Sequence, residues 1–132
     1  MRHLTRLTIT RFIALTVALA LSTPTTSLAA ANIDSFLPGF TDVPLFAGMT
    51  SDSESGVDFD TPAGRIVETI ATGAVTNQVT GESVTNFYQA TLPQLGWVRT
   101  GTLAFEREGE RLTLSLSESG GVLAVHFKLT PK

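Results

Sequence analysis

Histidine is the side chain that most often performs acid and base chemistry, because its pKa lies near neutral pH. The chain carries His3 and His126, and only His126 lies outside the amino-terminal segment interpreted below as a signal peptide. His126 alternates with apolar residues, so we expect it on the polar side of a strand. Ser115 and Ser117 occupy similar outward positions, and the motif G-x-S-x-G is absent. The pattern predicts a solvated strand histidine and not a serine–histidine catalytic pair.

Carboxylates are the second group that could do chemistry, since Asp52, Glu54, Asp58 and Asp60 lie close together in the sequence. Their oxygens suit calcium, but the D-x-D-x-D-G order and the closing glutamate of a calcium loop are missing. With Glu68, they could instead serve as the acid and base of a small hydrolase, although one tryptophan and one tyrosine are few for a sugar cleft. We expect an acidic turn and the polar face of a strand, with no catalytic residue, metal or cofactor.

Three arginines could clamp an anionic ligand, because a guanidinium forms paired hydrogen bonds with carboxylates and phosphates. These are Arg65, Arg107 and Arg111, and Glu108 and Glu110 lie beside two of them. We therefore expect solvated surface charges, with two of the arginines in turn-flanking ion pairs.

Tyr88 and Trp97 are aromatic residues of the kind that line binding pockets. Tyr88, however, falls on the apolar stripe of an expected helix. Trp97 follows a glycine that can end that helix, and an apolar residue there commonly packs back onto the last turn. We expect both residues in the hydrophobic core.

Residues 1–30 have the pattern of a cleavable secretory signal peptide. Arginines are followed by the apolar run Phe12–Leu21, a polar segment containing Pro24, and small residues. The apolar run is about half of the ~20 residues that cross a bilayer, which disfavours the alternative of an uncleaved membrane anchor. A lipid anchor would require a cysteine, and the sequence has none. We expect cleavage between Ala29 and Ala31, and no stable membrane insertion of the processed chain.

The charge of the remaining chain limits its partners. All twelve acidic residues but only six of the nine basic residues follow residue 30, so the processed chain has a net charge of −6. A strongly acidic body without a basic stripe argues against nucleic acid and against anionic lipid headgroups. About one hundred residues without disulfides are enough for one independent core. We expect an irregular lead-in over residues 31–41 and a single domain over 42–132.

The clearest expected element is a helix over residues 82–95. Val84, Phe87, Tyr88, Thr91, Leu92 and Leu95 share one face at helical spacing. Thr80 is the expected N-cap, and Gly96 is placed for the left-handed position that ends a helix. Pro93 lies inside this stretch and should kink the helix or end it early.

Strand patterns occupy the rest of the domain. Val57 and Phe59 alternate with Asp58 and Asp60 and predict a half-buried strand, which a Thr61–Gly64 turn joins to a second strand beginning at Arg65. Glycine-containing turns separate the later segments, which are apolar on one side only, and these segments are 97–99, 103–107, 111–117 and 122–129. Because the helix and sheet must bury their apolar faces together, we predict a two-layer α+β sandwich with a mostly antiparallel sheet and the order ββ-α-ββββ.

Several short segments of the sequence carry a resemblance to a known family. They are Asp42–Leu45, Phe59–Glu68, Phe87–Tyr88, Leu92–Trp97 and Arg107–Glu110. From Asp42 onward the chain resembles small, signal-peptide-bearing alphaproteobacterial proteins of unknown function. The resemblance implies an envelope location and a βαβ-type layout, and it brings no activity, ligand or catalytic residue.

These observations predict a non-enzymatic periplasmic or secreted domain that acts by protein or ligand contact, with an envelope protein as the expected partner. Two alternatives remain open at this point. One is a small periplasmic hydrolase that uses carboxylates. The other is an envelope inhibitor or assembly factor that uses an exposed sheet edge or an apolar patch.

Overall fold

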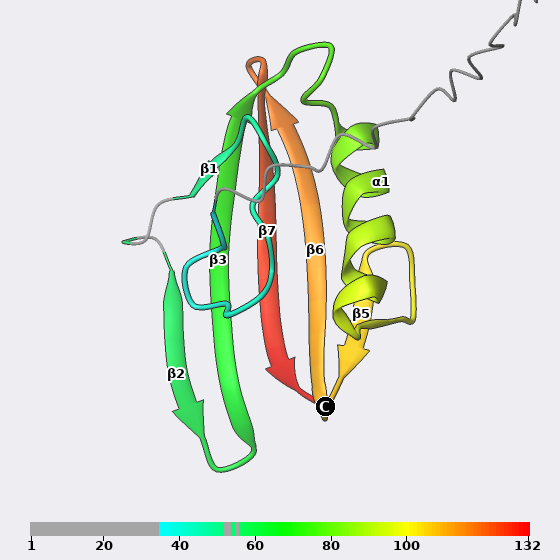
Figure 1. The fold of residues 1–132 in the computed structure, drawn as a ribbon. Helices are drawn as coiled ribbons and strands as arrows, with labels where there is room; N and C mark the ends of the chain where they lie inside the picture. Colours follow the sequence, from blue (N-terminus) through cyan, green and yellow to red (C-terminus); the bar gives the residue numbers. More distant parts are fainter. Residues whose placement is uncertain (1–34, 52–53, 55) are drawn as a thin grey trace, which may run out of the picture. The chain divides into compact units, whose positions relative to one another are not determined.

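The structure is a computed structural model that describes residues 35–51, 54 and 56–132 (Figure 1). The expected signal peptide over residues 1–30, its cleavage site, the start of the lead-in and Asp52 lie outside the described residues.

One antiparallel sheet contains every strand of the described ranges. Its order is β1-β3-β7-β6-β5-β4, and β2 pairs with β3 beside β1 (Figure 1). Hairpins with short turns join β2 to β3, β5 to β6 and β6 to β7, so the strands of these three pairs are neighbours both in sequence and in space. The strands are β1 (Thr50–Ser51), β2 (Val57–Thr61), β3 (Gly64–Ala74), β4 (Val98–Arg99), β5 (Ala104–Arg107), β6 (Glu110–Ser119) and β7 (Val122–Pro131).

The helix α1 (Gly81–Thr91) connects β3 to β4 and packs against β6. Thr80 caps it, because its side chain accepts a hydrogen bond from the Ser83 amide while the Ser83 side chain accepts one from the Thr80 amide. The chain then tightens into the 3₁₀ helix η2 (Leu92–Leu95), which contains Pro93, and ends at Gly96 with a φ of 88°. The expected N-cap, early end and left-handed glycine are therefore confirmed.

A second element covers the sheet together with the helix. An α-helix is about 10 Å wide and strands lie about 4.8 Å apart, so one helix covers only about two strands. The segment 35–49 covers the β3–β7 side: the rings of Phe40 and Phe127 lie 6.4 Å apart, and the Thr69 hydroxyl donates to the Pro38 carbonyl over 2.9 Å. In Figure 1, this segment crosses the same side of the sheet as α1.

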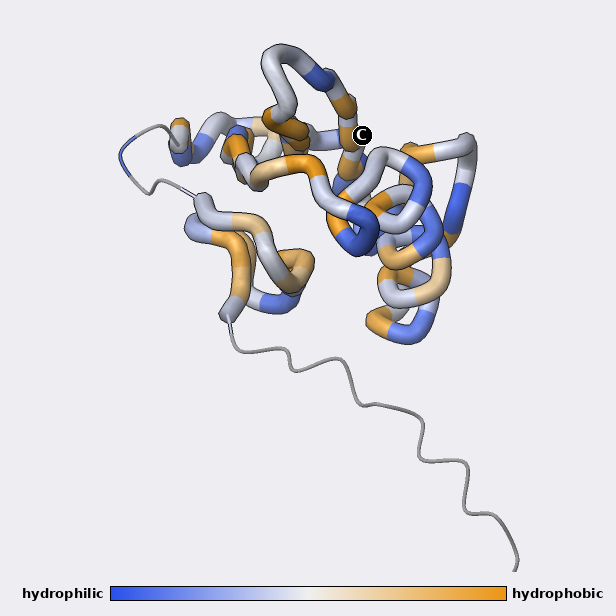
Figure 2. Tube along the Cα trace, turned by 90° about the horizontal axis from the view of Figure 1, so that it is seen from above, coloured by the Kyte–Doolittle hydropathy of each residue, from blue (hydrophilic) through white to orange (hydrophobic). Residues whose placement is uncertain are grey.

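The hydrophobic core lies between the sheet and these two covering elements. Along β7, buried apolar residues alternate with half-buried or exposed ones. Figure 2 shows how hydrophobic and hydrophilic stretches follow one another along the chain trace. The fully buried large side chains come from segment 35–49, the helix region and four strands, and include Leu37, Val43, Val67, Val84, Tyr88, Leu92, Phe105, Leu112, Leu123 and Phe127.

The predicted α+β class, with one helix packed on a mostly antiparallel sheet, is confirmed, and the short strand β1 is an addition to the predicted order. Thr50 and Ser51 form β1, directly before the expected acidic turn that begins at Asp52. Leu37 and Phe40 are core residues, so the packed unit includes part of the expected lead-in. Throughout the described ranges, no helix is long and apolar enough to span a bilayer.

Candidate functional site

The face of the sheet turned away from α1 and segment 35–49 is called the open face. Residues that are directly opposite one another in antiparallel strands point to the same side of a sheet. Leu129 pairs with Val67 on one side and with Leu112 on the other, and all three side chains are buried. Their sequence neighbours Lys128, Glu68 and Thr113 therefore lie on the open face. One strand row further along, Ile70, His126 and Ser115 form a second row on the same face.

Ion pairs cross the open face between β3 and β7. Lys128 Nζ lies 2.7 Å from one oxygen of Glu68, and His126 Nε2 lies 3.3 Å from the other. The hydrogen bond from Lys128 is the main cause that holds the pKa of the Glu68 carboxyl below its usual range, and the nearby His126 adds to it. Glu68 is therefore held as an anion, which suits an ion pair and not a proton donor.

His126 lies on the polar face of the last strand, as the sequence predicted. Ser115 is its direct partner in β6, and Glu68 is its acidic neighbour, so the three residue types of a catalytic triad are close together. Over the ranges that the structure describes, however, the Ser115 hydroxyl and the His126 ring form no hydrogen bond with each other, and neither residue lines either of the two hollows described below. The arrangement lacks the activated hydroxyl that acyl transfer requires.

The expected acidic cluster does not come together as one site. Asp58 pairs with the buried Val67 and therefore lies on the covered side of the sheet, whereas Glu68 points to the open face. A hollow of about 100 Å³ is bordered by both residues, but their carboxylates are on opposite sides of the sheet. Glu54 and Asp60 are exposed. Within the described ranges there is no group of three or more histidine, cysteine or acidic residues that could hold a metal ion.

Apolar side chains gather on the open face at the β2–β3 hairpin. Phe59 is 50% exposed, Val57 43% and Ile70 40%, and the half-buried Ile66 is the direct partner of Phe59. These four residues, Val57, Phe59, Ile66 and Ile70, are called the hairpin surface. Glu68, the direct partner of Val57, lies between Ile66 and Ile70 on this face, so the hairpin surface combines exposed apolar side chains with the Glu68–Lys128 ion pair. Exposed apolar side chains rimmed by polar groups are typical of an interaction surface.

The hairpin surface corrects the expectation for β2. Val57 and Phe59 do share one side of the strand and Asp58 and Asp60 the other, but the apolar side is the open one. Alternation alone cannot say which side of a strand faces the core. No signal in the sequence could have found this surface, because aspartates that alternate with apolar residues favour the opposite arrangement, with the carboxylates outward and the apolar side against the core.

Arg107 corrects the expectation for the arginines. It forms a salt bridge with Asp42 and donates a hydrogen bond of 2.8 Å to the Leu95 carbonyl. Its guanidinium carbon lies 4.3 Å from the centre of the Trp97 ring, a cation–π contact. Only 18% of its side chain is exposed, so Arg107 is a structural residue and not a solvated surface charge.

The other two arginines also have partners that sequence proximity did not predict. Arg65 Nε lies 2.7 Å from a Glu110 oxygen, and this hydrogen bond raises the pKa of the arginine. Arg111 pairs with Glu106 over 2.8 Å, across the β5–β6 hairpin. Glu108 was expected to pair with a neighbouring arginine, but it has no ion pair with any described residue.

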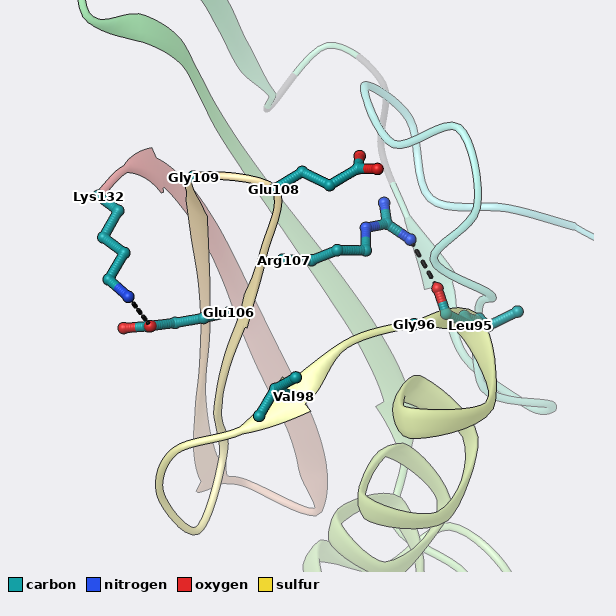
Figure 3. Close-up of a pocket in the computed structure, with 8 residues that line it drawn as sticks. All are labelled: Leu95, Gly96, Val98, Glu106, Arg107, Glu108, Gly109 and Lys132. Atoms are coloured by element: carbon teal, nitrogen blue, oxygen red, sulfur yellow. Dashed lines mark hydrogen bonds and ion pairs between the residues drawn. The ribbon is translucent and has the colours of Figure 1, made fainter.

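An open depression of about 680 Å³ lies beside Arg107 at the turn between β5 and β6 (Figure 3). Its cationic groups are already neutralised, because Lys132 pairs with Glu106 over 2.5 Å and Arg107 pairs with Asp42. We therefore find no arrangement here that would hold an anion. The lining residues are Leu95, Gly96, Val98, Glu106, Arg107, Glu108, Gly109 and Lys132.

Tyr88 and Trp97 are core residues, as predicted. Tyr88 is fully buried and its hydroxyl donates to the Pro44 carbonyl over 2.9 Å, while Trp97 is 2% exposed. Burial raises the pKa of the Tyr88 phenol. Neither aromatic ring is available to a ligand.

No family model, curated protein or solved structure matches this chain.

Proposed function

We propose that this chain is an exported, non-catalytic domain of the bacterial envelope that works by contact with another protein through the hairpin surface. The single observation that carries the proposal is the exposure of Val57, Phe59 and Ile70 together on the open face. Their burial against a partner would remove apolar area from water, which is the main driving force of protein association.

Export is supported by the sequence pattern of residues 1–30. A basic start, a short apolar run and small residues near Ala29 are the features by which the export machinery selects its substrates. The processed chain would then work in the periplasm or outside the cell, and the expected partner is another envelope protein.

Contact is favoured over catalysis by the electrostatics of the open face. The main candidate base, His126, lies beside a carboxylate whose pKa is lowered by Lys128, and its neighbour Ser115 is not hydrogen bonded to it. A general acid working near neutral pH needs the opposite shift of a carboxyl pKa.

Site-specific photo-crosslinking in intact cells tests the contact. A crosslinker at Phe59 should capture one dominant protein, whereas the same group at Asn86, an exposed residue of α1, should not. With the crosslinker kept at Phe59, the captured complex should be lost in the double variant Val57→Ser, Ile70→Ser and retained in Asn86→Ser. Equal capture from both positions, or turnover of a hydrolase substrate that disappears in His126→Ala, would contradict the proposal.

Fractionation tests the location. We expect the protein in the periplasmic or secreted fraction, with a mass that corresponds to cleavage between Ala29 and Ala31. Recovery from the cytosol with residues 1–29 still attached would overturn the export part of the proposal and leave the contact part to the crosslinking result.

A further inference from the structure

We propose that β2 binds an extended segment of the partner protein as an additional strand, and that this segment alternates basic with apolar side chains. This inference rests on the proposed function, because it names the chemistry of the partner that the hairpin surface contacts.

The backbone of β2 is an unfilled sheet edge in the described part of the chain. β2 pairs with β3 alone, and no other strand lies beyond it in Figure 1. Thr61 and Gly64 flank the two-residue turn and form the hydrogen-bonded pair of the hairpin. Because hydrogen-bonded and open positions alternate along the strand, the N–H and C=O groups of Asp58 and Asp60 point away from β3. An added strand would pair with these groups.

The side chains of this edge favour a particular partner. Val57 and Phe59 are exposed on the open face, and Asp58 and Asp60 are exposed on the other. Arg65 is the direct partner of Asp60 in β3 and also interacts electrostatically with Asp58, but it forms its ion pair with Glu110. Neither aspartate forms an ion pair with any residue that the structure describes, so both can still accept a cation from the outer side of β2. Side chains that are opposite one another in neighbouring strands contact directly, and opposite charges there are stabilising. A partner strand with lysine or arginine opposite the aspartates and apolar residues opposite Val57 and Phe59 would therefore be complementary to both sides of β2.

The same pattern disfavours a second copy of this chain as the added strand. An antiparallel pair of β2 strands centred on Phe59 would place Asp58 of each copy opposite Asp60 of the other, in both halves of the contact. Like charges directly opposite one another are destabilising, and charged residues on edge strands protect proteins against self-pairing. Two processed chains would also each carry a net charge of −6.

A hollow on the covered side leaves room for a long basic side chain near Asp58. Its volume is about 100 Å³, and it lies between β2 and the Pro38–Gly39 turn of segment 35–49. Gly39 borders it without a side chain, and a Cβ at this position would lie 3.8 Å from Oδ2 of Asp58. The carboxylate and the hollow are therefore adjacent.

Titration of the purified protein with synthetic peptides tests this inference by amide NMR. The probe is a seven-residue capped peptide in which lysine and valine alternate. One control has the same composition with lysines and valines in separate blocks, and the other has glutamate in place of lysine. We expect the alternating lysine peptide to bind at least about tenfold more tightly than either control, and the amides of Asp58 and Asp60 to become protected from hydrogen exchange.

Two variants separate the backbone contribution from the charge. Asp58→Pro removes an N–H that points to solvent and leaves the β2–β3 hydrogen bonds in place, so we expect an intact fold and a loss of affinity of about tenfold. The double variant Asp58→Asn, Asp60→Asn keeps every amide, and in it the lysine peptide should lose most of its advantage over the glutamate peptide. Phe59→Pro, which removes an amide bonded to β3, is the contrasting variant that should disrupt the hairpin.

The inference is overturned if the block peptide binds as tightly as the alternating one, or if the double aspartate variant keeps the full lysine preference. In that event, capture of a partner from Phe59 and its loss in the double serine variant would still support the proposed function. If Phe59 captures no specific protein, the proposed function fails even where the peptide binds.

Discussion

Arg107 and Asp42 are 65 positions apart in the chain and are joined by a salt bridge with two nitrogen–oxygen contacts. The bridge connects segment 35–49, which has little regular structure, to the end of β5. Arg107 also contacts the Trp97 ring and the Leu95 carbonyl. One side chain therefore holds together the two elements that cover the sheet and the strand at its far side.

Replacing Arg107 with alanine should lower the free energy of unfolding by about 2 kcal/mol, because Asp42 and the Leu95 carbonyl lose a charged donor in a partly buried place. Urea unfolding followed by circular dichroism measures this loss. Arg111→Ala is the matched control, since the Arg111 side chain is 52% exposed and its loss should change stability by less than about 1 kcal/mol. Equal losses in the two variants would contradict the structural role of Arg107.

Removal of the Tyr88 hydroxyl should also be costly. Tyr88→Phe leaves the buried Pro44 carbonyl without its donor, and we expect a loss of about 1–2 kcal/mol in the free energy of unfolding at neutral pH. Because burial raises the pKa of this phenol above the unfolded value of about 10, the unfolded chain releases the proton first as the pH rises. Stability due to Tyr88 is therefore lost above about pH 10.

The variant tests that sign directly. Unfolding curves measured from pH 9 to 11 should fall more steeply for the natural protein than for Tyr88→Phe, since only the former carries the buried phenol. Parallel curves would show that the hydroxyl ionises as readily in the folded chain as in the unfolded one.

Acid should weaken the ion pairs around Glu106. Hydrogen bonds from Lys132 and then Arg111 lower the pKa of its carboxyl in the folded chain. The stabilisation is present above the unfolded value of about 4.3 and is lost as the pH falls through the lower folded value. Glu106→Gln should therefore flatten the acid side of the stability profile, measured as thermal midpoint against pH. Glu118→Gln, a carboxylate without an ion pair to any described residue, should leave the profile unchanged.

Gly39 tests how closely segment 35–49 packs on the sheet. Its φ is 79°, and a Cβ there would lie 2.6 Å from Cγ1 of the buried Val67. Gly109 has a similar φ of 83°, but a Cβ there would meet nothing within 4 Å. Gly109→Ala should cost only the backbone term of about 1 kcal/mol, whereas Gly39→Ala should cost at least about 2 kcal/mol by adding a steric clash.

Chemical denaturation of the two alanine variants gives this comparison. Because both glycines have left-handed backbones, the difference between the variants isolates the contact with Val67. No difference would mean that segment 35–49 moves away from β3 without a loss of stability.

Much of the fold could be read from local patterns. The stripe from Val84 to Leu95 placed the helix, Thr80 and Gly96 marked its ends, and Pro93 marked the change to a 3₁₀ turn. These features depend on interactions within a few residues of one another, which is why a linear sequence suffices for them.

Much less of the candidate site could be predicted from the sequence. Alternation showed that Val57 and Phe59 share a side of β2, but only the pairing with β3 decided that this side is the open one. The partners of Arg65, Arg107 and Arg111 were likewise decided by contacts between distant segments or across a hairpin, and not by the nearest acidic residue in sequence.

Segment 35–49 shows the physical reason for this division. Helices and strands can be identified in a sequence because their apolar residues recur at a regular spacing. Segment 35–49 has no such spacing, so the burial of Leu37, Phe40 and Val43 could not be predicted. They are buried because a single eleven-residue helix is too narrow to cover the whole sheet. Segment 35–49 covers the remaining apolar surface of β3 and β7. The need for this second cover exists only once the strands are paired, and it belongs to the tertiary structure.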